Sequence, residues 1–260
     1  MTLFVSDLHL GRGTAAETAS AERDARALLD AHAAALCDGG TLVLLGDVFD
    51  QFLEYRHLVP KTGLRLTAAL ADLADGGARV LYAVGNRDPW HLPGGLFQDL
   101  GVEVLRGGAL LELEGRRVWV EHGDAYDPGR RRASRGGRWA PAAHRLLRRP
   151  AVARAFRNAL PADGAYALTR AVAARFGTDG TPDPAVAAAL QAEALVRLRT
   201  TDAEIVVHGH SHAAARADGA AGTYLNPGYW FGARAYARLD PPRPGGADGP
   251  ALLRWTGPLS

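Results

Sequence analysis

Five short polar clusters hold the side chains of this 260-residue sequence that could do chemistry. They are Asp7-Leu-His9, Gly46-Asp-Val-Phe-Asp50, Gly85-Asn-Arg-Asp88, His122-Gly-Asp124 and His208-Gly-His-Ser-His212. Carboxylate, imidazole and amide groups bind manganese, iron, zinc or magnesium, whereas iron–sulfur and most structural zinc sites need thiolates. The only cysteine, Cys37, lies outside the clusters. The residue types therefore predict a site for divalent metal ions.

The number of these groups indicates two ions. One ion needs only three or four of them, whereas two ions roughly 3.5–4 Å apart and bridged by one carboxylate would use them all. We expect Asp47 to be the bridge. Paired ions of this kind hydrolyse phosphate esters and pyrophosphate bonds, so hydrolysis of such a bond is the predicted reaction.

Each cluster alone has a simpler explanation. Asp7 and Asp47 could cap the helices that follow them, and His122 could be a buried histidine with satisfied hydrogen bonds. Gly85 and Asn86 could be turn residues. The three alternating histidines of the last cluster are harder to explain as a surface tract, and the conjunction of all five clusters favours the metal site.

Each cluster follows a predicted strand. Thr2–Ser6, Thr41–Gly46 and Arg79–Gly85 are short apolar strands that alternate with the helices Ala21–Cys37 and Leu64–Asp75. Strands joined by crossover helices form a mostly parallel sheet, and loops at the carboxyl ends of such strands converge on one crevice. We therefore expect the clusters to meet in space.

The second half of the chain predicts a further sheet and a helical insertion. The expected strands are Val102–Leu105, Leu110–Leu113, Val118–Glu121, Glu204–His208, Thr223–Leu225, Ala235–Leu239 and Leu252–Trp255. A turn at Glu114-Gly115 joins two of them. Residues 127–200 instead have helical spacing, broken at Pro150, Pro161 and Pro182. We expect an α/β fold with a core of residues 1–126 and 201–260 and a helical cap of residues 127–200.

In order and content the clusters resemble the motifs of the calcineurin-like metallophosphoesterases, from Thr2 to about Pro227. That resemblance implies two packed mixed β-sheets flanked by helices. It assigns one ion to Asp7, His9, Asp47 and His212, and the other to Asp47, Asn86, His122 and His210. It also implies that Asn86, Arg87, Asp88 and His210 serve catalysis. Manganese is the expected metal, with iron, zinc or magnesium as alternatives.

Arg87 departs from the common pattern of the family, which has histidine after Gly-Asn as a general acid. Arginine does not release its proton at physiological pH, so an alkoxide leaving group would be served badly. A pyrophosphate bond avoids this difficulty, because its leaving group is a phosphate monoester with a second pKa of about 6. Arg87 therefore favours a diphosphate substrate.

The sequence Gly85-Asn-Arg-Asp88 and the neighbouring motifs resemble the UDP-2,3-diacylglucosamine pyrophosphatase branch of the family, as does Phe52–Lys61. The resemblance implies cleavage to UMP and 2,3-diacylglucosamine 1-phosphate in lipid A synthesis. One alternative is a phosphodiesterase or phosphatase of the same family that acts on a different substrate. The other is a non-catalytic binding protein stabilised by metal. Within the insertion the resemblance thins, and Tyr166, Arg170 and Arg175 are candidates for substrate contacts.

The insertion also holds the strongest charge bias in the chain. Residues 130–157 contain ten arginines and no acidic residue, although the net charge of the protein is only +2. Three interpretations stay open: a solvated helical face, contact with an anionic membrane surface, or nucleic-acid binding, which the scarcity of aromatic residues disfavours. The absence of a signal sequence and of a long apolar run predicts a cytoplasmic protein. Under the second interpretation it would also contact the inner face of the membrane. The sequence does not indicate an oligomeric state.

Overall fold

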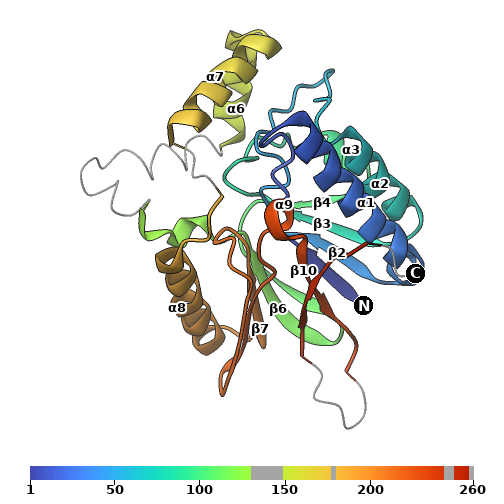
Figure 1. Ribbon diagram of the computed structural model, residues 1–260, viewed down its shortest axis with the longest axis vertical. Coiled ribbons are helices and arrows are strands. Elements are labelled where there is room, and N and C mark those ends of the chain that lie inside the picture. Colours follow the sequence, from blue (N-terminus) through green and yellow to red (C-terminus); the bar gives the residue numbers. More distant parts are fainter. Residues whose placement is uncertain (130–148, 177–179, 243–248, 258–260) are drawn as a thin grey trace.

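The computed structural model describes residues 1–129, 149–176, 180–242 and 249–257, excluding the side chains of Pro150, Ala153, Arg157 and residues 172–176. Its centre is a pair of β-sheets with helices on both outer faces (Figure 1). No described helix is both long enough and apolar enough to cross a bilayer.

The first sheet has six strands in the order β11-β10-β1-β2-β3-β4. Strands β1 (Thr2–Val5), β2 (Thr41–Leu44), β3 (Arg79–Ala83) and β4 (Glu103–Leu105) are parallel to one another. Strands β10 (Ala235–Leu239) and β11 (Ala251–Arg254) complete the sheet in antiparallel pairing. The parallel part is the one that the alternating strands and helices predict.

The second sheet has five strands in the order β5-β6-β7-β9-β8. It contains β5 (Ala109–Leu113), β6 (Arg116–Glu121), β7 (Ile205–His208), β8 (Ala215–Gly219) and β9 (Gly222–Asn226). Strands β6, β7 and β9 are parallel, and both edge strands pair antiparallel. Both sheets are therefore mixed.

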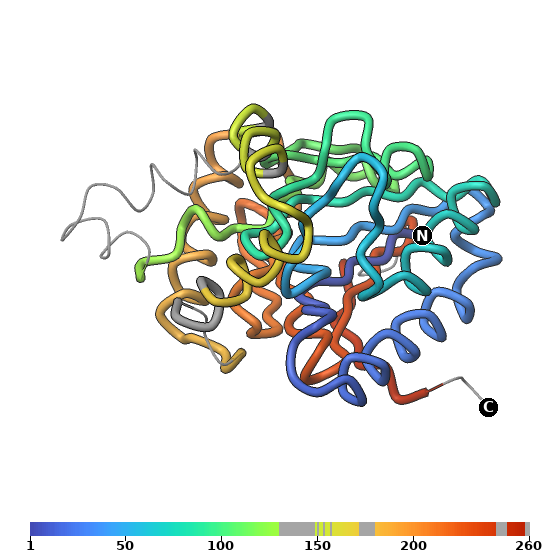
Figure 2. The backbone as a smooth tube through the Cα atoms, turned by 90° about the horizontal axis from the view of Figure 1, so that it is seen from above, coloured from blue at the N-terminus to red at the C-terminus, as the bar shows by residue number. Residues whose placement is uncertain are grey.

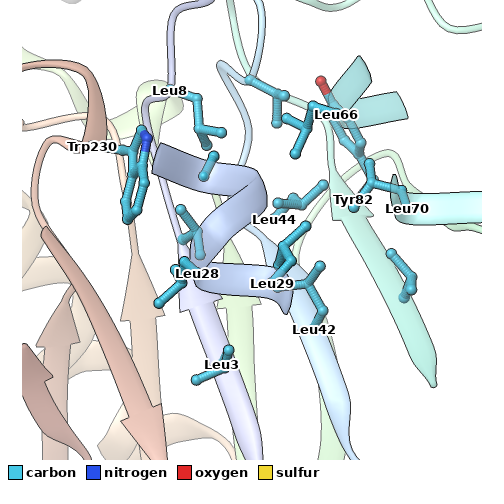
Figure 3. Packing of buried hydrophobic residues seen from close by; sticks show 14 of the residues in the cluster. Leu3, Leu8, Leu28, Leu29, Leu42, Leu44, Leu66, Leu70, Tyr82 and Trp230 are labelled. Atoms are coloured by element: carbon cyan, nitrogen blue, oxygen red, sulfur yellow. The ribbon is translucent and has the colours of Figure 1, made fainter. Parts of the chain in front are cut away.

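Alternation along β1 shows how the layers are built. Leu3 and Val5 join the core beneath α1 (Ala15–Cys37) and α2 (Leu64–Asp75), whereas Phe4 points into the core between the sheets. Figure 3 shows the first of these cores, where Leu28 and Leu29 of α1 pack against strand residues. On the far side, α8 (Pro184–Thr200) covers the second sheet with Leu190, which is fully buried. The result is a four-layer α/β/β/α sandwich.

Helices α6 (Pro150–Ala159) and α7 (Ala162–Phe176) stand apart from these layers, at one end of the molecule (Figures 1 and 2). Ala165 of α7 is buried against Leu53 and Trp90, and Phe156 of α6 packs on the same cluster. The predicted insertion, residues 127–200, thus contains a helix pair beside the core and one helix, α8, that forms an outer layer of the sandwich.

The short elements are α3 (Leu96–Asp99), α9 (Trp230–Ala233) and the 3-10 turn η1 (Asp124–Tyr126). The expected strands are all present with ends shifted by a residue or two, and α2 has the predicted bounds. The prediction for the first helix was wrong at its start: α1 begins at Ala15, because Thr14 and Glu17 form a capping box. Strand β8 was not predicted.

Candidate metal centre

Seven polar side chains from the five sequence clusters meet where strands of both sheets end. They are Asp7, His9, Asp47, Asn86, His122, His210 and His212. The backbone at most of these positions is unusual. Asp7, His9, Asp47, His210 and His212 have φ angles between 42° and 66°, and they are five of the seven non-glycine residues with positive φ in the described chain. Such strain persists only where surrounding contacts enforce it, and it concentrates at functional sites.

Glycines in the clusters allow the loops to approach one another closely. A Cβ atom on Gly85 would lie 2.2 Å from Asp47 Oδ1, and one on Gly209 would lie 2.0 Å from Ser6 Oγ. One on Gly46, whose φ is +86°, would lie 2.8 Å from both the Gly85 backbone and His122 Nδ1. Each Gly is therefore required by the convergence of its neighbours.

Asp7, His9 and His212 form a first group of ligand atoms. The Nε2 atoms of His9 and His212 lie 3.1 Å apart, and Asp7 Oδ1 is 3.5 Å from the first and 3.3 Å from the second. All three side chains are buried. Three ligand atoms that converge in this way can surround one cation.

Asp47 lies between this group and a second one. Its Oδ2 is 3.8 Å from His9 Nε2, while its Oδ1 is 3.6 Å from His122 Nε2. The amide oxygen of Asn86 is 3.3 Å from the same His122 nitrogen. The two oxygens of Asp47 thus face different histidines, as expected of a bridging carboxylate.

Asp7 also reaches the second group, because one of its carboxylate oxygens lies within 4.8 Å of ligand atoms of Asp47 and His122. His210 lies next to the second group, because the centroid of its ring is 5.1 Å from that of the His122 ring. Its backbone N–H donates to Asp7 Oδ2 at 2.9 Å. The geometry therefore places two carboxylates, Asp7 and Asp47, between the two histidine pairs.

The described residues fit divalent cations. Asp7 Oδ1 is buried and accepts no hydrogen bond among them, which leaves a carboxylate oxygen available as a ligand. Burial opposes the protonation of His122, but the charge of Asp47, its hydrogen bond and further carboxylates raise the pKa of His122 to about 10. His122 thus reports a strongly negative local field, and a cation would be attracted by the same field.

Backbone carbonyls fix the orientation of two imidazoles. His122 Nδ1 donates to the carbonyl of Leu45 at 2.7 Å, and His212 Nδ1 donates to that of Gly180 at 2.8 Å. When each ring is neutral, the donor role of Nδ1 leaves Nε2 as the nitrogen with the lone pair, and this nitrogen faces the site. Gly180 lies between α7 and α8, so the predicted insertion contributes directly to the orientation of His212.

Tyr229 and the ion pair between Arg12 and Asp50 lie next to the group of Asp7, His9 and His212. The Tyr229 ring stacks on His212 with centroids 4.2 Å apart and planes 10° from parallel. Arg12 donates from Nε to Asp50 Oδ1 at 2.9 Å and from Nη1 to Tyr229 Oη at 3.4 Å. Asp50 Oδ1 is in turn 3.4 Å from His9 Nδ1. Tyr229 and Arg12 were not predicted, because a lone tyrosine and a loop arginine carry no motif of their own.

Asp88 is fully buried, and its two oxygens accept hydrogen bonds from both neighbouring loops. The donors are the backbone N–H groups of Asp47, Val48, Phe49 and Gly85 and the hydroxyl of Tyr82. Burial and the nearby charge of Asp47 raise the pKa of Asp88 to about 6, against the opposing effect of its donors. Asp88 thereby ties the loop of Asp47 to the loop of Asn86.

Arg87 follows Asn86 at the same loop. Its backbone N–H donates to Asp47 Oδ1 at 2.7 Å. Burial raises the pKa of Asp50, but a hydrogen bond to His9 and the charges of Arg12 and Arg87 outweigh it and lower that pKa. The Arg87 guanidinium therefore lies close enough to act on the charge of the site.

The three residues of the insertion that were expected to contact substrate all lie on α7. Tyr166 is half-buried next to Ala165, and Arg170 is exposed. Within the described part of the chain, no hydrogen bond, ion pair or ring contact joins either side chain to the seven ligand candidates. The side chain of Arg175 lies outside the described residues.

Comparison with known proteins identifies the family. The sequence profile of the calcineurin-like phosphoesterases matches residues 1–214. The chain belongs to this family. The family match and the two mixed sheets confirm the resemblance that the sequence motifs indicate.

Several relatives bear one name, UDP-2,3-diacylglucosamine hydrolase. The protein from Aeromonas hydrophila is 30% identical over 243 residues, covering 88% of this chain and 90% of the relative. That from Nitrosococcus oceani is 30% identical over 220 residues, covering 81% and 78%. That from Porphyromonas gingivalis is 35% identical over 123 residues, and this match covers only 46% of the chain and 45% of the relative. The chain thus spans less than half of some relatives and most of others.

Proposed function

We propose that this protein hydrolyses the pyrophosphate bond of UDP-2,3-diacylglucosamine to give UMP and 2,3-diacylglucosamine 1-phosphate, as a step of lipid A synthesis. The observation that carries the proposal is the convergence of all seven ligand candidates next to an arginine in the Gly-Asn-Arg-Asp loop. The name shared by relatives that align over most of the chain supports the choice of substrate.

In the proposed site, seven residues bind the metal ions and other residues bind the substrate. We assign Asp7, His9, Asp47, Asn86, His122, His210 and His212 to two divalent ions, with manganese as the first choice. When bound, such ions supply an ionised water near neutral pH and neutralise charge on phosphoryl oxygens. Manganese suits a site of carboxylate, amide and imidazole groups without thiolates.

Arg87 is the residue that selects a diphosphate. An arginine guanidinium offers two parallel N–H donors to phosphate oxygens, which stabilises charge that develops on the departing phosphate. It does not supply a proton, and a phosphate monoester does not need one to leave. Asp88 serves the reaction by position, since its oxygens hold the loops that carry Asp47 and Asn86.

In this proposal the side chain of His210 lies beside the phosphorus atom of the substrate. Its Nε2 lies 3.3 Å from Asp127 Oδ2, so a carboxylate orients the ring from the side of the insertion. Asp127 was not predicted as a site residue. Tyr166, Arg170 and Arg175 remain our candidates for substrate contacts on α7, with the acyl chains directed toward the inner face of a membrane.

A substrate panel tests this function. The purified protein is assayed with manganese against UDP-2,3-diacylglucosamine, a UDP-sugar, a cyclic nucleotide and a phosphoprotein. We expect the nucleotide diphospholipid to have the highest kcat/KM. A preference for the cyclic nucleotide or phosphoprotein would replace the proposal with another phosphoesterase activity, and no turnover of any substrate with both ions bound would support a binding protein.

A further inference from the structure

The loop after the second ligand cluster carries an exposed apolar tip. Leu58 and Val59 are 55% and 51% exposed, and Leu64 at the start of α2 is 51% exposed. Single apolar side chains are ordinary on protein surfaces, but here two adjacent residues of one loop are both more than half exposed. Nothing in the described chain covers them.

Positive charge surrounds this tip. Arg56, His57, Lys61 and Arg65 are all exposed, and Lys61 is the only lysine of the protein. No acidic residue occurs between Tyr55 and Ala71. Within the described residues, Arg56, Lys61 and Arg65 form no ion pair. The segment therefore combines apolar side chains with uncompensated cations.

The tip stands on a rigid base. Tyr55 and Leu58 form an antiparallel bridge that closes a tight turn at Arg56-His57, and Leu53 pairs with Trp90. Glu54 is buried and accepts hydrogen bonds from the backbone of the loop after β3. A base fixed in this way holds the apolar tip in solvent instead of letting it fold back on the core.

The same base connects the tip to the helix pair. Tyr55 packs on the cluster of Leu53, Trp90 and Ala165, together with Phe156 of α6. In Figure 1 the loop after β2 rises at the end of the molecule where α6 and α7 lie. Leu168 of α7 is 47% exposed, and Arg154 and Arg170 are exposed on these helices. Apolar and basic side chains of both elements thus mark one end of the protein.

We propose that residues 56–65 dock on the surface of an anionic lipid bilayer, with Leu58 and Val59 inserted between headgroups and the cations on the lipid phosphates. Apolar insertion and attraction to anionic lipid act together at such interfaces, and each alone binds weakly. This inference rests on the proposed function for the choice of a bilayer, since a diacyl substrate resides there. Docking would hold the metal centre next to the membrane, because the loop begins directly after Asp50.

Vesicle co-sedimentation of the full chain tests the proposal without any turnover. The vesicles contain phosphatidylcholine alone or mixed with phosphatidylglycerol, at low and high salt. We expect binding to the anionic vesicles only, with release at high salt because screening weakens the contacts of the cations. The double variant Leu58→Ser/Val59→Ser should bind about tenfold less, as should Lys61→Glu/Arg65→Glu.

The matched control is Leu195→Ser/Val196→Ser on α8, which removes a similar exposed apolar pair, 39% and 51% exposed, from another surface. It should bind like the wild type. All variants should hydrolyse a water-soluble phosphodiester at the wild-type rate, which shows that the site is intact. Equal binding to neutral vesicles, no binding by the wild type, or an equal loss in the α8 control would overturn the proposal. Failure of the diphospholipid assay with the binding pattern intact would overturn only the proposed substrate.

Discussion

The ligand loops and the helix pair α6–α7 differ in how many contacts determine their positions. Around Asp47, glycines without room for a Cβ, the hydrogen bonds to Asp88 and strained backbone angles all specify one arrangement. Among the described side chains, the helix pair packs on the core through a small cluster in which Ala165, Leu53 and Trp90 are the buried members. Reaction chemistry needs positions fixed within fractions of an ångström, and only the ligand loops are specified by contacts of this density.

The insertion approaches the metal centre at Gly180, between α7 and α8. The Gly180 carbonyl orients His212, and its backbone lies over Tyr229 and Arg12. Displacing Gly180 should therefore affect the metal centre. Variants in the ligand loops and variants in the insertion, compared with each other, test whether this contact influences the metal centre.

The largest effect is expected at the centre of the ligand loops. Asp47→Ala should remove both ions and reduce turnover by several orders of magnitude, because this carboxylate faces both histidine groups. Metal content by elemental analysis and activity on a soluble phosphodiester measure the two losses. Asp30→Ala, which removes an exposed carboxylate from α1, is the control and should retain both ions. Normal turnover in Asp47→Ala would contradict the assignment of two ions.

Arg87 tests whether the loops also select the leaving group. Arg87→Ala should lower kcat/KM on a diphosphate about 10²–10³-fold, the usual cost of removing one charge-stabilising donor. Arg87→His should not restore that rate, but it should gain on alkyl phosphodiesters, where general-acid help is worth about 10²–10⁴-fold. The ratio of kcat/KM on the two substrates for all three proteins is the measurement. If the wild type prefers the alkyl diester and Arg87→Ala leaves the ratio unchanged, the argument from the leaving group is wrong.

A smaller effect is expected where the insertion approaches the metal centre. Gly180 has a φ of +88°, and a Cβ there would lie 2.8 Å from Tyr229 Oη and 2.9 Å from Arg12 Nη1. Gly180→Ala should therefore displace the carbonyl that orients His212 and weaken metal binding at that side about 10–100-fold. Tyr229→Leu removes the stacked ring and should act in the same direction.

Tyr229→Phe is the matched control, because it keeps the stacked ring and loses only the hydroxyl. Metal titration by calorimetry should show nearly wild-type affinity for this variant. If Gly180→Ala also binds both ions as tightly as the wild type, the insertion does not influence the metal centre, and the two regions are independent.

The same difference explains what the sequence could predict. The strands and the convergence of the five clusters were predictable because each motif couples a residue type to a local geometry: glycine where backbones touch, and Asp or His directly after an apolar strand. The bridging role of Asp47 stays a prediction, and the structure adds that Asp7 also faces both groups. Tyr229, Arg12 and Asp127 were not predictable, because their contacts join residues far apart in the chain. The substrate contacts of Tyr166 and Arg170 stay a prediction, because helical spacing alone does not specify which way α7 faces.

The smallest effect on catalysis is expected from a truncation in the helix pair, and a matched truncation in the core makes it interpretable. Phe97 is fully buried among Phe49, Phe52 and Tyr82, so Phe97→Ala should lower the free energy of unfolding by about 3–5 kcal/mol.

Phe156 contacts Trp90 with ring centroids 4.7 Å apart but is only partly buried. Phe156→Ala should therefore change the denaturant midpoint of the core little, while α6 and α7 become cleavable by a protease at low concentration, because local opening depends on few contacts. Hydrolysis of a soluble phosphodiester should stay near the wild-type rate, since no described side chain of α6 or α7 touches the ligands. A loss of several kcal/mol in the global unfolding of Phe156→Ala, equal to that of Phe97→Ala, would show that the helix pair and the sandwich unfold as one unit and that the distinction between them is wrong.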